Sequence, residues 1–331
     1  MKKRLLSMIL VVLLGITLLA GCKKNVGTPE DNAVSEAETE NGSTEEAGYT
    51  FGYCCIDMSN PYYDSLQLSI KTTLEDSGNH LITKNPQGDI DTQLEQINEL
   101  IEAGVDSVFL CPVDWEAIAP GLQALKDAGI PIINIDTQVK DSDMIDAYVG
   151  SDNKNAGFVC GEDLIKKMPD GGKIVVLECQ TMNSINDRIT GFEEAIVDNG
   201  FEVIERANAQ GEEKQAKIEI ERMLAKYDQI DVIMCGNDQM ALGALEAVKA
   251  AGRQNIKIYG VDGSPEIKTE LAKGNSQIEG TGAQSPINIG KKVVDTALAI
   301  MNHEQYEQEV YEPTFFIDKD NVELYGTDGW Q

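Results

Sequence analysis

Residues 49–331 alternate between short apolar runs and longer segments with a helical repeat of apolar positions. The repeat is clearest over residues 89–103, where Ile90, Leu94, Ile97 and Ile101 recur every three or four residues. In the first half, this pattern predicts strands at 49–56, 107–110 and 130–135, and helices at 61–77, 89–103 and 116–128. Strands that alternate with helices in this order predict a parallel sheet with helices on both faces.

The second half of the chain repeats the first. Residues 74–82 match residues 196–204, and each segment contains a helix end, a capping glycine and a new strand in the same order. Residues 105–111 match residues 230–235 at nearly the same offset. We therefore predict an α/β fold with two similar doubly wound parallel-sheet lobes. A ligand is expected beyond the C-terminal strand ends, in a hinged cleft between the lobes.

Residues 1–22 have the pattern of an export signal. Lys2, Lys3 and Arg4 precede an apolar run over residues 5–19, which is shorter than the ~18 to 20 residues that span a bilayer. The ending Leu-Ala-Gly-Cys resembles the lipobox of bacterial lipoproteins. This resemblance implies a signal peptide over 1–21 and a lipid anchor at Cys22, on the extracytoplasmic face of a bacterial membrane. An export signal followed by an unrelated cysteine is the alternative.

Composition and charge narrow the class of partner. Residues 22–48 are rich in Glu, Ser, Thr, Asn and Gly, and we expect them to form a disordered acidic tether. The net charge of −29 argues against nucleic acid as a partner, because phosphate binding needs a basic face. The charge does not identify a ligand, since solubility outside the cell also explains it.

The remaining cysteines are interpreted as core residues. Most of Cys54, Cys55, Cys111, Cys160, Cys179 and Cys235 lie in apolar, strand-like runs, where a free cysteine behaves as a small hydrophobic residue. One disulfide is the alternative, because the expected compartment lies outside the cytosol. No CxxC motif or Cys/His spacing typical of zinc occurs. We expect neither a metal nor a cofactor.

Enzyme motifs are missing from the sequence. There is no dinucleotide-binding, phosphate-loop, nucleophile-elbow or HExxH motif. The two histidines, His80 and His303, fall at a predicted strand start and helix end, where neither is placed to act as a general base. A glycoside hydrolase with Asp136 and Asp262 as its carboxylate pair is an alternative. We favour a binding protein, because hydroxyl binding accounts for both aspartates and no extended subsite is evident.

The loops after the predicted strands carry aromatic and planar hydrogen-bonding side chains. Carboxylates, amides and guanidinium groups pair with neighbouring hydroxyls, and aromatic rings pack on the C–H face of a sugar. We predict a site for a polyhydroxylated small molecule made of Asn60, Tyr62, Tyr63, Trp115, Asp136, Asp152, Arg188, Asn237, Asp262 and Gln284. Local roles are the alternatives: Asn60 and Asn237 as helix caps, Asp136 as a loop cap, Arg188 as a surface cation and Trp115 in local packing.

Several motifs together resemble one family. They cover residues 59–63, 135–136, 151–153, 188–192, 236–244, 260–263 and 283–284. In order and type they are similar to the ribose- and galactose-binding branch of the type 1 periplasmic binding proteins, the receptors of sugar ABC importers. The resemblance extends from about Tyr49 to the end of the sequence. It places sugar contacts at Asn60, Tyr62, Tyr63, Asp136, Arg188, Asn237, Asp262 and Gln284.

The resemblance also implies architecture and partners. Three chain crossings, near 149–152, 283–286 and 313–316, divide the chain into an N-terminal lobe of 49–151 plus 285–313 and a C-terminal lobe of 152–284 plus 314–331. The implied ligand is a monosaccharide or a similar polyhydroxylated molecule, and the implied partner is an ABC permease in the membrane. We expect the protein to act as a monomer.

Departures from the family pattern leave the ligand open. Cys111 stands where ribose receptors have an amide, Thr137 stands where an arginine often follows the aspartate, and residues 209–211 lack an aromatic. Changed donors and a missing ring argue against a firm assignment of ribose. A hexose, another pentose, a polyol and a furanosyl signal remain alternatives. A sensor whose closed state is read by a membrane kinase or chemoreceptor is the alternative to transport.

Overall fold

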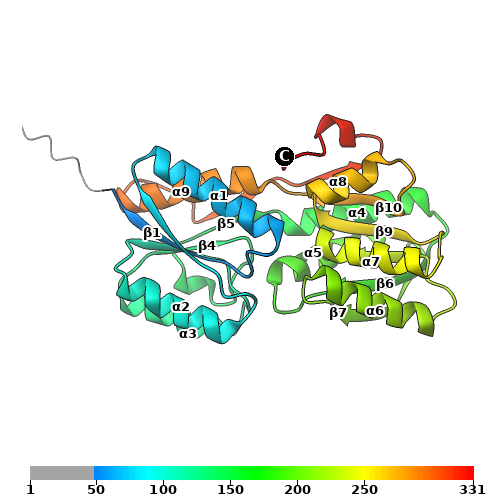
Figure 1. Ribbon diagram of the computed structural model, residues 1–331, viewed down its shortest axis with the longest axis horizontal. Coiled ribbons are helices and arrows are strands. Elements are labelled where there is room, and N and C mark those ends of the chain that lie inside the picture. The colour runs from blue at the N-terminus through cyan, green and yellow to red at the C-terminus, as the bar shows by residue number, and fades with distance from the viewer. Residues whose placement is uncertain (1–47) are drawn as a thin grey trace, which may run out of the picture. The chain divides into compact units, whose positions relative to one another are not determined.

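The computed structural model describes residues 48–331, which form two α/β lobes (Figure 1). The predicted signal peptide, Cys22 and all but the last residue of the predicted tether lie outside the described residues. Within residues 48–331, none of the helices combines the length and the apolar character needed to cross a membrane.

The first lobe is built on a six-stranded sheet in which every pairing is parallel. Its strands, in sheet order, are β11 (Glu309–Glu312), β5 (Ala147–Ser151), β4 (Ile132–Ile135), β3 (Ser107–Leu110), β1 (Thr50–Cys54) and β2 (His80–Lys84). Its helices are α1 (Pro61–Asp76), α2 (Ile90–Glu102), α3 (Ala119–Asp127), η1 (Ser142–Met144) and α9 (Pro286–Met301). Helices α1 and α9 pack together, as do α2 and α3, and each pair covers its own apolar cluster.

The second lobe has the same strand order. Its strands, in sheet order, are β12 (Phe315–Asp318), β10 (Ile278–Ala283), β9 (Lys257–Asp262), β8 (Val232–Cys235), β6 (Gly172–Glu178) and β7 (Phe201–Asn208). Only the edge strand β12 runs antiparallel to its neighbour. Its helices are α4 (Asn153–Lys167), α5 (Asn183–Ile196), α6 (Glu213–Lys226), α7 (Asp238–Ala250), α8 (Pro265–Ala272) and η2 (Val322–Leu324). The prediction of two similar doubly wound lobes is therefore confirmed.

The predicted elements of the first half are confirmed with small shifts at their ends. The strand predicted at 107–110 coincides with β3, and the helix predicted at 89–103 is α2, shortened by one residue at each end. Helix α2 begins there because the side chain of Asp89 accepts a hydrogen bond from the backbone N of Thr92. The apolar stripe of α2 buries Ile97 completely, as its period predicts.

The chain passes between the two sheets three times. Strand β5 leads into α4, β10 leads into α9, and β11 leads into β12, so each crossing joins an element of one lobe to an element of the other. Ser285 begins α9 after the second crossing, since its hydroxyl accepts a hydrogen bond from the backbone N of Asn288. This connectivity supports the lobe boundaries expected from the sequence, which stay a prediction.

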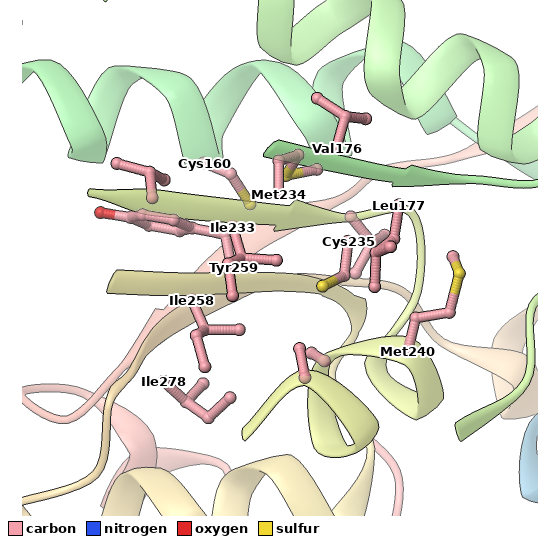
Figure 2. Close-up of a cluster of buried hydrophobic side chains, with 14 of the residues drawn as sticks. Cys160, Val176, Leu177, Ile233, Met234, Cys235, Met240, Ile258, Tyr259 and Ile278 are labelled. Carbon is pink, nitrogen blue, oxygen red and sulfur yellow. The ribbon is translucent and has the colours of Figure 1, made fainter. Parts of the chain in front are cut away.

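Cysteines contribute to the cores, as predicted. Figure 2 shows Cys160 and Cys235 among Met234, Ile258 and Tyr259 in the second lobe. All six cysteines of residues 48–331 are buried and free, so this part of the chain contains no disulfide. Burial raises the pKa of these thiols, because the charged thiolate loses its hydration; the pKa of Cys54 rises to about 12.

Candidate functional site

Eight of the ten predicted site residues line one small cavity between the lobes. The cavity has a volume of about 10 Å³ and is lined by Asn60, Tyr62, Tyr63, Asp136, Met182, Ser184, Ile185, Arg188, Asn237, Asp262 and Gln284. A larger cleft of about 650 Å³ adjoins it and shares Asn60, Tyr63 and Met182 with it. The volume of this larger cleft lies within the range of small-molecule sites, ~300 to 1,000 Å³.

The first lobe contributes two adjacent tyrosines at the start of α1. Asn60 fixes this start, because its Oδ1 accepts a hydrogen bond of 3.0 Å from the backbone N of Tyr62 and Pro61 occupies the first helical position. The rings of Tyr62 and Tyr63 meet edge to face with centroids 5.4 Å apart, and both are buried. Asn60 therefore caps the helix and also lines the cavity.

Asp136 lies just after β4 in a left-handed backbone conformation, with φ of 61°. Its Oδ2 accepts hydrogen bonds of 3.4 Å from the hydroxyls of Tyr63 and Thr137. Its Oδ1 is buried and has no hydrogen-bond partner among the described residues. A buried carboxylate oxygen without a donor is costly, so this atom is the acceptor that a ligand hydroxyl can satisfy.

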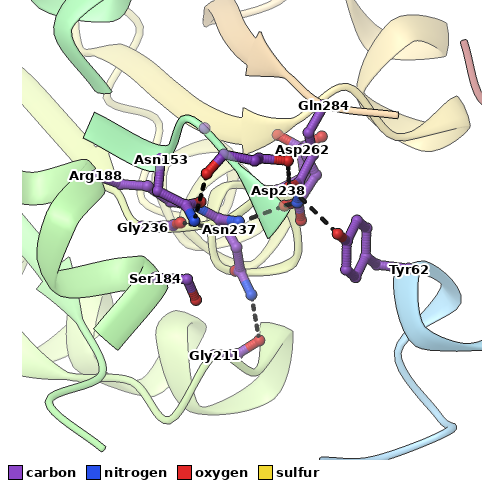
Figure 3. Close-up of polar contacts among 12 residues, drawn as sticks. Tyr62, Asn153, Ser184, Arg188, Gly211, Gly236, Asn237, Asp238, Asp262 and Gln284 are labelled. Carbon is purple, nitrogen blue, oxygen red and sulfur yellow. Dashed lines mark hydrogen bonds and ion pairs between the residues drawn. The ribbon is translucent and has the colours of Figure 1, made fainter. Parts of the chain in front are cut away.

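The second lobe contributes a buried ion pair. Arg188 on α5 and Asp262 at the end of β9 are 3% and 4% exposed, and Arg188 Nη1 lies 3.2 Å from Asp262 Oδ1. The same guanidinium donates to the carbonyl of Gly236 at 3.0 Å and to Asn153 Oδ1 at 2.8 Å (Figure 3). These bonds fix the plane of the guanidinium, a geometry suited to neighbouring hydroxyls.

Burial and charge shift the pKa of both partners. Burial raises the pKa of Asp262 to about 7, although the charge of Arg188 acts in the opposite direction. Burial alone would lower the pKa of Arg188, but the carboxylates of Asp262 and Asp136 outweigh it, so its pKa is raised. Arg188 therefore stays charged, and Asp262 is the titrating partner near neutral pH.

Gln284 connects the lobes at the second crossing. Its Oε1 accepts hydrogen bonds from the hydroxyls of Ser151 at 2.6 Å and Tyr62 at 3.3 Å, and both donors belong to the first lobe. Its Nε2 donates to Asp262 Oδ1 at 2.8 Å, in the second lobe (Figure 3). One amide side chain thus couples a tyrosine of one lobe to the ion pair of the other.

Asn237 holds two pieces of backbone. Its Oδ1 accepts from the backbone N of Met240 at 2.9 Å, which caps α7, and its Nδ2 donates to the carbonyl of Gly211 at 3.0 Å. The next residue, Asp238, is fully buried and accepts hydrogen bonds from the backbone N of Ser264 at 2.7 Å and the hydroxyl of Thr281 at 2.8 Å. Asp238 therefore orders the loop that follows Asp262.

The structure does not bring the other two predicted residues to the cavity. Asp152 is exposed, and its Oδ1 caps α4 by accepting from the backbone N of Asn155 at 3.0 Å. Trp115 lies at the boundary between the lobes, where its backbone N donates to the carbonyl of Thr181 at 3.0 Å. Its ring centroid lies 6.0 Å from the amine of Lys140. Helix capping therefore accounts for the side chain of Asp152, and the amine of Lys140 is the neighbour of the Trp115 ring.

Three cavity residues are not among the ten predicted site residues: Met182, Ser184 and Ile185. They lie where the chain enters α5 after β6, and the hydroxyls of Ser184 and Thr137 form a hydrogen bond of 2.7 Å between the lobes. Their position after the strand β6 was the available signal, but their side chains resemble ordinary core and helix residues. Residues 48–331 contain no cluster of three or more His, Cys, Asp or Glu side chains suited to a metal ion.

Comparisons with known proteins agree with this architecture. The family described as "Periplasmic binding protein domain" matches residues 51–305. The ribose import binding protein of Escherichia coli is 26% identical over 76% of this chain and 84% of its own length. An ABC transporter solute-binding protein from Mycobacterium smegmatis with bound glycerol is 26% identical, with a TM-score of 0.81 over 86% of this chain and 99% of that one. One from Bacillus halodurans with bound myo-inositol is 25% identical, with a TM-score of 0.78 over 85% and 99%.

Proposed function

Because the chain belongs to the periplasmic binding protein family, whose members bind solutes and are not enzymes, we propose that it captures a monosaccharide-like molecule and delivers it to an ABC permease. The observation that carries this proposal is the cleft between the lobes, in which the small polar cavity adjoins a space of about 650 Å³. Polar groups from both lobes and from the chain crossing converge there, represented by Asp136, Arg188 and Gln284.

The chemistry of the cavity favours a polyhydroxylated ligand. Each hydroxyl both donates and accepts, and the site offers an unpartnered carboxylate oxygen on Asp136, a fixed guanidinium on Arg188 and the phenol groups of two tyrosines. Ribose in the name of the E. coli relative, and glycerol and myo-inositol in the two structures, belong to this chemical class. Cys111 and Thr137 lie next to Asp136 and change the hydrogen-bond donors there from those of ribose receptors. We therefore propose a chemical class of ligand and not one sugar.

Ligand binding stabilises the closed arrangement of the lobes. Residues of the two lobes reach the same ligand only when the cleft is closed. The closed form therefore binds the ligand more tightly than the open form, and binding shifts the equilibrium toward the closed form. The contacts of Gln284 and the bond between Thr137 and Ser184 already join the lobes in this structure. The permease would then recognise surfaces of both lobes together.

The proposal includes a lipid anchor at Cys22. Its support is the sequence alone: a basic start, an apolar run and the ending Leu-Ala-Gly-Cys. Metabolic labelling with radioactive palmitate in a bacterial host should label the wild-type protein, and Cys22→Ser should lose the label and leave the membrane fraction. An equally labelled Cys22→Ser protein would refute the anchor without affecting the proposal for the cleft.

Calorimetric titration of desalted protein with a panel of monosaccharides, polyols and nucleosides tests the binding function. We expect one chemical group of the panel to bind and Asp136→Asn to weaken that binding, whereas Asp143→Asn, an exposed aspartate outside the cavity, should not. No binding of any compound at millimolar concentration would refute the proposal. Uptake that is unchanged in a strain lacking a binding-competent protein would refute transport and favour the sensory receptor.

A further inference from the structure

Residues 329–331 lie against the site without lining it. They follow β12 and η2, and Val322 of η2 is buried in the core of the second lobe. Figure 1 shows this segment in red, with its end between α8 and the helices α1 and α9 of the first lobe. Neither Trp330 nor Gln331 is among the residues that line the cavity.

Trp330 crosses to the first lobe. Its ring meets the ring of Tyr62 edge to face, with centroids 5.8 Å apart and an angle of 73° between the planes. Trp330 is partly buried and packs against the apolar cluster of the first lobe, which includes Tyr62 and Tyr63. A side chain carried by the second lobe therefore contacts a site tyrosine of the first.

The neighbours of Trp330 are bound to the second lobe and the crossing. Gln331 Nε2 donates to the carbonyl of Asp262 at 3.3 Å and also to the carbonyl of Gln284. Lys268 Nζ donates to the carbonyl of Gly329 at 2.6 Å and to Gln331 Oε1 at 3.1 Å. Lys268 is fully buried, so its ammonium depends on these acceptors for the hydrogen bonds that water would otherwise supply.

We propose that Trp330 is a positioning residue that holds Tyr62 in place for ligand binding and for closure of the lobes. Tyr62 donates to Gln284, and Gln284 donates to Asp262, so the contact with Trp330 is the first step of a continuous path to the ion pair. Edge-to-face aromatic pairs add stabilisation beyond their buried area. Trp330 and Tyr62 belong to different lobes, so a change in their separation on opening would shift the balance between the open and closed states.

The inference rests on the proposed function for its ligand readout, but it also predicts an effect without ligand. With Trp330 truncated, Tyr62 loses a packing partner, so the backbone amides at the start of α1 and near Gln284 should exchange hydrogen faster. A purely structural role in the second lobe predicts lower thermal stability and no change at α1.

Trp330→Ala is the test, with Trp330→Phe as the conservative variant. Tyr325→Ala is the matched control, because Tyr325 stacks on Phe315 within the second lobe, with centroids 5.0 Å apart. We expect Trp330→Ala to weaken binding of the best monosaccharide of the panel by about 3- to 10-fold, a range set by typical aromatic pair energies. Trp330→Phe should recover part of the affinity, and Tyr325→Ala should leave it unchanged.

Hydrogen exchange followed by mass spectrometry, without ligand, separates the two proposals. Faster exchange at residues 60–63 in Trp330→Ala but not in Tyr325→Ala would support the positioning role, even if no compound of the panel binds the wild-type protein. Exchange and affinity that match the wild type in Trp330→Ala would overturn the inference while leaving the proposed function intact. Equal effects of the two variants on α1 would also overturn it.

Discussion

Arg188 and Asp262 form an ion pair of 3.2 Å in the buried part of the cleft, and three further polar groups fix its geometry. The guanidinium donates to Asn153 and Gly236, and the carboxylate also accepts from Gln284. A pair held in this way presents defined hydroxyl-binding positions before a ligand arrives, which reduces the ordering cost of binding.

Loss of Arg188 should destabilise the protein strongly. Arg188→Gln removes the cation beside Asp262, which then binds a proton, and it also removes the donor to Asn153 Oδ1 and to the carbonyl of Gly236. Buried acceptors left without a donor cost about 1 to 3 kcal/mol each in the free energy of unfolding. The matched control is Arg222→Gln, whose partner Glu205 lies 2.6 Å away at the surface and whose loss should cost less than about 1 kcal/mol. Urea unfolding without ligand measures both, and equal losses would contradict the expectation.

Asp262 should make a contribution to the free energy of unfolding that decreases as pH rises. Its pKa is raised by burial to about 7 in the folded protein, against about 4 in the unfolded chain. Between these values the folded state holds a proton that the unfolded state has released, so the contribution of Asp262 to the free energy of unfolding falls as pH rises. Above the folded pKa that contribution becomes constant.

The comparison with Asp262→Asn isolates this effect from the other carboxylates. Free energies of unfolding, measured across this pH window, should show the advantage of the wild type over Asp262→Asn decreasing as pH rises. A difference that is independent of pH, or that increases with pH, would contradict the raised pKa.

Asp136→Asn should separate affinity from stability. Asparagine can keep the acceptor that the hydroxyls of Tyr63 and Thr137 use, and it replaces the one oxygen of Asp136 that has no partner within the described structure, so this change should not lower the free energy of unfolding without ligand. Loss of a charged acceptor should weaken ligand binding by about 10- to 100-fold. Asparagine is the suitable replacement, because it tolerates the φ of 61° better than alanine does. Calorimetry and urea unfolding on the same samples check both statements, and a large loss of stability would contradict the first.

The buried cysteines should be unreactive in the folded protein. Burial raises their thiol pKa, and all six in residues 48–331 are free. In a Cys22→Ser background, a thiol reagent such as DTNB should modify none of them in the native state and all six after unfolding. Fewer than six reactive thiols in the unfolded protein would show that a disulfide forms.

The elements and the lobes were predictable because their signals are local. A helix that packs by one face repeats its apolar residues every three or four positions, so α2 and its buried Ile97 follow from the sequence alone. The repeated order of strands and helices predicted two similar lobes, and the two sheets of the structure have the same strand order. Polar and aromatic residues directly after strands predicted most of the cavity lining, because parallel strands end at one edge of a sheet.

The sequence by itself therefore determined the secondary structure, the pair of lobes and the chemical character of the cleft, since each depends on short-range patterns. Tertiary structure alone decided which polar side chains reach the cavity. Asp152 turns to cap a helix, while Ser184 and Met182 enter the site. It also decided that Trp330 meets Tyr62. The direction of a side chain at a chain crossing and contacts between distant segments depend on how the lobes pack, and no local pattern encodes them.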